Sequence, residues 1–88
     1  MNREEIRTKV NELMHRGFEI PFEKLTPESK LFEELGLDSL DAVDMLVNLE
    51  ENLGVKVAGE RLSKIKTLQD VYELVSEAQL SQPPLSAP

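Results

Sequence analysis

Residues 31–54 read LFEELGLDSLDAVDMLVNLEENLG and combine a strong helix signal with a high local concentration of acid. The chain has 17 Asp and Glu residues, and seven of them lie in this stretch. The other 10 acids balance the 10 Lys and Arg residues, so this stretch accounts for the whole formal net charge of −7. One-signed charge gathered in one segment is typical of an electrostatic docking surface, although a solvated helix face is the alternative. The acids are Glu33, Glu34, Asp38, Asp41, Asp44, Glu50 and Glu51, and the stretch has no Lys, Arg or His.

A helix is predicted within this stretch, from Asp38 to near Gly54. Asp is a favoured N-cap, because its carboxylate can accept a hydrogen bond from the amide of residue 40 or 41, and Gly commonly follows a helix end. At about 100° per residue, one broad apolar arc of this helix should face a core. The arc consists of Ala42, Met45, Leu46, Leu49 and Leu53.

A second, narrower apolar stripe on the same helix consists of Leu40, Val43 and Val47. An apolar ridge bordered by carboxylates is typical of a docking site, in which apolar anchors supply affinity and charges steer the encounter. The alternative is that a neighbouring short helix covers the stripe. Its borders carry Ser39 and Glu50 on one side and Asp44 and Glu51 on the other.

Two further long helices are predicted on either side. Asn2 and Glu5 have capping-box spacing at the start of the first, which should end near Gly17, and Thr67 and Asp70 have it at the start of the last. Helically spaced apolar residues follow in the first helix: Ile6, Val10, Leu13 and Met14. The last helix has its own apolar face: Leu68, Val71, Tyr72, Val75 and Ala78.

The connection over residues 17–37 is rich in apolar side chains, so we expect it to fold across a core. These side chains are Phe18, Ile20, Phe22, Leu25, Leu31, Phe32 and Leu35. A short helical piece is expected around Glu60–Lys64. Residues 1–80 should then form one all-α domain, a small three- to four-helix bundle with a long first loop, and residues 81–88 (SQPPLSAP) a disordered tail.

Composition excludes several classes of protein. No run approaches the roughly 20 apolar residues of a membrane span, and the N-terminus lacks the apolar run of a signal peptide. The chain has no Cys, hence no disulfide, no thiolate metal site and no thiol of its own. An acidic chain without a strong basic patch is a poor match for nucleic acid. We expect a cytoplasmic protein that acts as a monomer.

Ser39 follows the predicted cap and occupies the first helical position, where side chains are normally exposed. Its neighbours do not form the G-x-S-x-G pattern of a hydrolase nucleophile, and the only histidine, His15, lies on the polar face of the first helix. An unactivated hydroxyl is a weak nucleophile, so we expect no catalytic residue and no enzyme. A phosphate attached to Ser39 would lie at the positive end of the helix dipole, with Asp38 opposing it somewhat.

The segment LGLDSLDAVDMLVNLEENLGV, with its D-S-L motif, strongly resembles acyl carrier proteins. The resemblance covers roughly residues 3–78 and extends to LEE and to KIKTLQDV at the start of the last helix. It implies that a holo-acyl-carrier-protein synthase transfers 4′-phosphopantetheine from coenzyme A to Ser39, and that acyl groups are then held as thioesters on the terminal sulfur. It also implies that an acyl chain can enter between the helices.

By the same resemblance, acyl-loading and acyl-processing enzymes with basic patches would recognise the helix after Ser39 in fatty-acid, lipid or polyketide-type biosynthesis. The expected contacts are Asp38, Leu40, Asp41, Val43, Asp44, Val47, Glu50 and Glu51. A stand-alone peptidyl or aminoacyl carrier and an unmodified binding module remain alternatives. A calcium site is disfavoured, because the spacing Asp38, Asp41, Asp44 is helical and does not match D-x-D-x-D-G.

The chain departs from the family pattern after Gly54. Family members often continue with an acidic I-P-D-E-D stretch, whereas residues 55–66 read VKVAGERLSKIK, with Ala58 and Gly59 in place of Pro and Asp. The cations Lys56, Arg61, Lys64 and Lys66 outnumber Glu60. This change of sign predicts a specialised carrier that serves a dedicated ligase or synthase pathway. The alternative is that Gly59 loosens a short helix and the cations are solvated.

Overall fold

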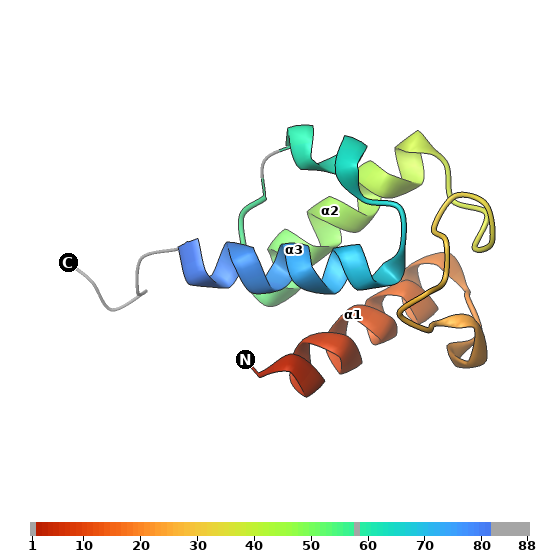
Figure 1. The fold of residues 1–88 in the computed structure, drawn as a ribbon, viewed down its shortest axis with the longest axis horizontal. Helices are drawn as coiled ribbons and strands as arrows, with labels where there is room; N and C mark the ends of the chain where they lie inside the picture. The colour runs from red at the N-terminus through yellow and green to blue at the C-terminus, as the bar shows by residue number, and fades with distance from the viewer. Residues whose placement is uncertain (1, 58, 82–88) are drawn as a thin grey trace.

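The structure is a computed structural model that describes residues 2–57 and 59–81. The described residues form helices joined by loops (Figure 1). They contain no strand, only one isolated β-bridge between Lys30 and Thr67. The predicted all-α class is therefore confirmed. The elements are α1 (Arg3–Phe18), η1 (Phe22–Lys24), α2 (Ser39–Leu53), η2 (Gly59–Lys64) and α3 (Leu68–Ser81), where η marks a 3₁₀ helix.

The predicted short helix therefore exists as the 3₁₀ helix η2, and η1 was not expected. Ser81, assigned to the tail, is the last residue of α3, and the rest of the predicted disordered tail lies outside the described residues. No helix within residues 2–57 and 59–81 is long and apolar enough to cross a membrane.

The helix ends follow the predicted capping signals closely. Asn2 Oδ1 accepts a hydrogen bond from Glu5 N at 2.8 Å, and α1 ends at Phe18, one residue beyond Gly17. The left-handed residue that terminates α1 is Glu19, with φ 56°. Asp38 caps the start of α2, and Gly54 ends it with φ 68° while its N–H donates to Glu50 O at 3.1 Å.

α1 packs against both α2 and α3, and the core lies where the three helices meet (Figure 1). The apolar arc predicted for α2 is buried, except that Leu53 is half-buried. The apolar face predicted for α3 is buried throughout, with Leu74 added to it. In α1, Leu13 is only half-buried. The side chains with the least exposure are Val10, Met14, Leu31, Met45, Leu49, Val55, Leu68, Val71 and Val75.

The long loop does fold across the core, as predicted, but not with all of its apolar residues. Most of its apolar side chains are buried or pack against the core: Phe18, Ile20, Leu25, Leu31, Leu35 and Leu37. Phe22 and Phe32 remain 53% and 40% exposed, so the expectation is wrong for these two residues. Phe22 instead stacks on the His15 ring on the outside of α1, with the ring centroids 4.1 Å apart.

Backbone hydrogen bonds tie this loop to the segment that leads into α3. Leu31 N donates to Lys66 O, Leu68 N donates to Ser29 O, and Gln69 N donates to Pro27 O, each at 2.9 Å. Ser29 is buried, and its hydroxyl donates to Lys24 O at 2.6 Å. The middle of the loop that precedes α2 is therefore held by the start of α3.

Asp70 completes the capping box at the start of α3. Its Oδ2 accepts from Thr67 N at 3.1 Å and from Lys66 N at 2.8 Å, while Asp70 N donates to Thr67 Oγ1 at 3.4 Å. Partial burial alone would raise the pKa of Asp70. This effect of burial is outweighed by the hydrogen bonds from the Lys66 and Thr67 amides and from the Thr67 hydroxyl, together with the Lys66 charge. The pKa of Asp70 is therefore held below its usual value.

Asp70→Asn should therefore change how the free energy of unfolding depends on pH in the acidic range. Because the folded pKa is lowered, the stabilising contribution of the carboxylate is present above the ordinary Asp pKa of about 4 and is lost as the pH falls through the folded value. We expect the variant to be less stable at pH 7 by up to about 1 kcal/mol, as for loss of a cap. Urea unfolding at pH values from about 7 down to 2 should show the two proteins converging, and a pH-independent difference would contradict this account.

Candidate functional site

Ser39 is the first residue of α2, and a reciprocal capping box holds the backbone on which it lies. Asp38 Oδ1 accepts from Asp41 N at 2.9 Å, and Asp41 Oδ2 accepts from Asp38 N at 3.2 Å. The Asp38 cap was predicted from the sequence, whereas the return bond from Asp41 was not. The i, i+3 spacing of the two acids is the signal that would have revealed it, since an acid at the third helical position can close such a box.

The Ser39 side chain is exposed to solvent. None of the side-chain hydrogen bonds seen among residues 2–57 and 59–81 involves its hydroxyl. Free amides at the start of a helix carry partial positive charge, which favours an anionic substituent at this position. An exposed, unengaged hydroxyl at such a place fits a covalently attached phosphate group, because nothing must be displaced to reach it.

Leu40, Val43 and Val47 form an exposed apolar stripe beside Ser39, with 76%, 47% and 43% of their surface accessible. η2 contacts α2, yet it leaves these three residues open, so the alternative in which a short helix covers the stripe is wrong. Exposed apolar residues in a row mark a contact surface more often than scattered ones do.

The carboxylates of α2 and its N-cap differ in their exposure and in the hydrogen bonds that they accept. Asp44 and Glu51 are exposed. Glu50 is half-buried, and its Oε2 accepts from Val57 N at 3.2 Å, so it also holds the segment that follows α2. Asp38 and Asp41 each use one oxygen in the capping box. Sequence reasoning placed all five on one docking surface and did not separate these roles.

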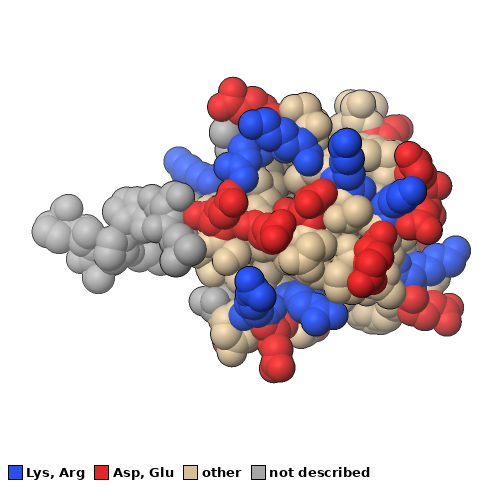
Figure 2. Space-filling view, in the orientation of Figure 1, with Lys and Arg blue, Asp and Glu red and all other residues tan. Residues whose placement is uncertain are grey.

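The basic residues after α2 are also partly engaged within the fold. Arg61 of η2 forms an ion pair with Glu77 of α3. On the face that carries α3, basic and acidic side chains are interspersed, and neither sign dominates (Figure 2). Gly59 begins η2 as its first residue, and Ala58 lies outside the described residues.

Other features of the described residues lie apart from Ser39. A cavity of about 410 Å³ lies between α1 and α3, and its lining includes Ile6, Arg7 and Tyr72 but no residue of α2. His15 Nδ1 lies 2.8 Å from Ile20 O, so the histidine is engaged on α1 and has no contact with Ser39. Within the described part of the chain, no three acidic or histidine side chains gather as metal ligands would.

Comparison with known proteins shows which family the chain resembles. A family profile described as the phosphopantetheine attachment site matches residues 4–75. The acyl carrier protein of Thermosynechococcus vestitus is 38% identical over 76 residues, which cover 86% of this chain and 94% of that protein. Acyl carrier protein 2 of Ralstonia nicotianae is 38% identical over 75 residues, which cover 85% and 93%. The crystal structure of an acyl carrier protein from Thermotoga maritima superposes with a TM-score of 0.77 at 26% identity, covering 91% of this chain and 93% of that one.

Proposed function

The chain belongs to the acyl carrier protein family, which carries a covalently attached 4′-phosphopantetheine and is not enzymatic, and we propose that Ser39 is its attachment site. The observation that carries the proposal is the exposed Ser39 hydroxyl, free of hydrogen bonds to the described residues, at the first position of α2. When attached, the arm supplies the thiol on which acyl groups are held as thioesters. The chain has no cysteine, so it provides no thiol that would compete.

In the proposed attachment step, the Ser39 oxygen attacks the phosphorus of coenzyme A that bears the pantetheine group. A bond forms between Oγ and phosphorus as the bond from phosphorus to the bridging oxygen breaks. Adenosine 3′,5′-bisphosphate leaves with the electron pair of the broken bond. The hydroxyl proton must pass to a base on a holo-acyl-carrier-protein synthase, because His15 is engaged elsewhere and no described group hydrogen bonds the hydroxyl.

We also propose that α2 is the surface that partner enzymes recognise. The apolar stripe Leu40, Val43 and Val47 would bury against the partner, while the carboxylates around it would meet a basic patch. The residues that would take part are Asp38, Leu40, Asp41, Val43, Asp44, Val47, Glu50 and Glu51. A carrier must leave each enzyme after reaction, so binding should be fast, weak and sensitive to salt.

Incubation with coenzyme A and a holo-acyl-carrier-protein synthase, followed by intact-mass measurement, tests the attachment directly. We expect the gain of one phosphopantetheine group, and no gain would favour the alternative of an unmodified binding module. Loading the product with acyl and with aminoacyl groups in parallel then separates an acyl carrier from a peptidyl or aminoacyl carrier. We expect acyl groups, on the basis of the dense acids of α2 and the similarity to acyl carrier proteins.

A finer proposal is that this carrier serves a dedicated ligase or synthase pathway in the cytoplasm. It rests on the basic residues of the segment after α2, where family members often have acids. A partner that contacts η2 as well as α2 must then accommodate the positive charge of η2. A general elongation enzyme should therefore use this carrier poorly.

Arg61→Glu, alone or with Lys56→Glu, should improve use of the holo protein by a fatty-acid elongation enzyme. Exposed charge pairs are worth about 0.2–1 kcal/mol, so we expect roughly a 1.4- to fivefold gain in the elongation rate. Because Arg61→Glu also breaks the ion pair with Glu77, the matched control is Glu77→Gln, which breaks the pair but leaves η2 positive. Elongation by the unaltered protein at the rate of a housekeeping carrier from the same cell would contradict the idea.

A further inference from the structure

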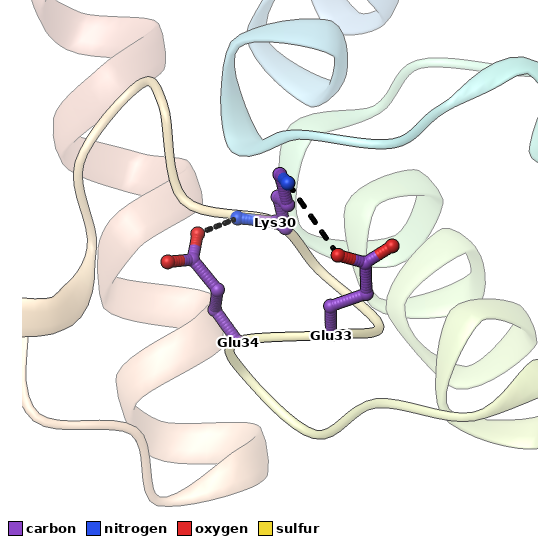
Figure 3. A network of polar contacts seen from close by, with 3 residues as sticks. All are labelled: Lys30, Glu33 and Glu34. Carbon is purple, nitrogen blue, oxygen red and sulfur yellow. Dashed lines mark hydrogen bonds and ion pairs between the residues drawn. The ribbon is translucent and has the colours of Figure 1, made fainter.

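Glu33 and Glu34 are neighbours in the loop before α2, but they make different contacts with Lys30 (Figure 3). Glu34 Oε1 accepts a hydrogen bond from the backbone N–H of Lys30 at 2.7 Å. Glu33 Oε2 lies 3.5 Å from Lys30 Nζ, and both of these side chains are largely exposed. An exposed ion pair contributes little to stability, whereas a carboxylate bonded to a backbone amide fixes the backbone itself.

The hydrogen bond from Lys30 N to the Glu34 side chain closes a turn. Backbone hydrogen bonds to Lys30 O close the same turn. Glu34 N and Leu35 N both donate to Lys30 O, at 2.9 and 3.0 Å. Both backbone polar groups of Lys30 are therefore bonded within the same turn, one of them by a side chain. Removing the Glu34 carboxylate would leave the Lys30 N–H without this hydrogen bond. The turn would then be closed only by the two backbone hydrogen bonds to Lys30 O.

This turn is anchored to the fold and leads into α2. Within the turn, Leu31 N is bonded to Lys66 O, which anchors the loop to the start of α3. After the turn, Gly36 adopts φ 73°, Leu37 N donates to Leu31 O at 3.1 Å, and Asp38 then caps α2. The path from the anchor to Ser39 passes through the turn that Glu34 closes.

We infer that Glu34 is a positioning residue for the reaction at Ser39, an inference that rests on the attachment function proposed above. Glu34 does not touch Ser39, but it holds the turn from which the first turn of α2 extends. Phosphoryl transfer requires the attacking oxygen to be in line with the leaving oxygen, so a small displacement of the hydroxyl lowers the rate. The effect should appear in the turnover of the carrier by the synthase, not in its docking.

Two substitutions separate the hydrogen bond of Glu34 from its charge. Glu34→Gln removes the charge but keeps an oxygen that can accept from Lys30 N at the same reach. Glu34→Asp keeps the charge, but its side chain is one methylene shorter and withdraws from the amide. Glu33→Gln is the matched control, because it removes the same charge from the adjacent residue and leaves the turn closed.

The test measures kcat and KM for phosphopantetheine transfer by a holo-acyl-carrier-protein synthase, with each protein as the acceptor and intact mass as the readout. We expect Glu34→Asp to lower kcat on the order of tenfold, with Glu34→Gln and Glu33→Gln close to wild type in kcat. Amide hydrogen exchange should be faster at Lys30 and at Asp41 in Glu34→Asp than in Glu34→Gln. Circular dichroism of each variant shows whether the helices are retained.

The outcomes are distinguishable. If wild type gains the arm and Glu34→Asp is modified with the same kcat, the positioning role is wrong while the attachment function stands. If Glu34→Gln is slow and Glu34→Asp is not, the carboxylate acts through its charge and the positioning role is also wrong. If wild type itself gains no arm, the proposed attachment function fails, and the positioning role fails with it.

Discussion

Ser39→Ala is expected to gain no phosphopantetheine under conditions in which the wild-type protein is fully modified. The substitution removes the one oxygen to which the motif assigns the bond, and the exposed position leaves the rest of the site unchanged. Because Ser39 is exposed and Asp38 supplies the cap, we expect the free energy of unfolding to change by less than about 0.5 kcal/mol. Intact mass after incubation with coenzyme A and a synthase measures modification, and urea unfolding measures stability.

Ser63→Ala is the matched control for this experiment. Ser63 is also exposed, but it lies in η2 and its hydroxyl donates to Glu60 O at 3.0 Å. The control variant should be modified like wild type. Persistent gain of the arm by Ser39→Ala would place the attachment on another residue and refute the assignment of Ser39.

Much of the fold could be predicted because its signals are local. The caps at Asp38 and Gly54 and the capping box of Thr67 and Asp70 are patterns of residues within one or two turns of each other. The apolar arcs of α2 and α3 likewise follow from helical periodicity within each element. Such patterns can be recognised without knowledge of what the helix packs against.

The features that were missed depend on contacts between distant segments. The backbone bonds from Pro27, Ser29 and Leu31 to residues 66–69 carry no sequence signature, since any residue except Pro offers the same amide and carbonyl. The exposure of Phe22 also could not be predicted, because it depends on a stacking partner, His15, on α1. Apolar content indicated that the loop is folded, but not which of its residues face outward.

The candidate site shows the same division. The exposure of Ser39 and of the apolar stripe of Leu40, Val43 and Val47 could be predicted, since helical position determines both. The additional bond of Glu50 to Val57 N could not, because it joins α2 to a segment seven residues on that follows no regular period. Nor did charge counting separate Glu34, which bonds the backbone of Lys30, from Glu33, which forms only a surface ion pair.

These structural roles decide which acids give a clean test of electrostatic docking. Asp38, Asp41 and Asp44 all belong to the proposed docking surface, and the sequence alone marks only Asp38, the predicted N-cap, as a residue whose reversal should also lower stability. The structure adds Asp41 to that exception, because its carboxylate closes the capping box. Loss of a cap costs on the order of 1 kcal/mol, so reversal of either residue confounds docking with folding. Asp44 and Glu51, which are exposed on α2, do not carry this complication.

Asp44→Lys combined with Glu51→Lys should therefore slow phosphopantetheine transfer and acyl loading without unfolding the bundle. Each reversal replaces attraction to a basic patch by repulsion, and exposed pairs are worth about 0.2–1 kcal/mol each, so the double variant should lose on the order of tenfold in kcat/KM at low salt. The loss should appear mainly in KM and in the association rate, since rim charges act on encounter.

Glu73→Lys combined with Glu4→Lys is the control for total charge, because these exposed acids lie on α3 and α1, away from Ser39. It changes the net charge of the protein by the same amount, so any general effect of lowering the negative charge appears equally in both variants. If α2 is the docking surface, only the Asp44 and Glu51 reversal should slow the reaction, and the difference should shrink as added salt shortens the screening length to about 10 Å or less. Equal loss in both variants, or a loss that salt does not reduce, would mean that partners do not recognise α2 by its charge.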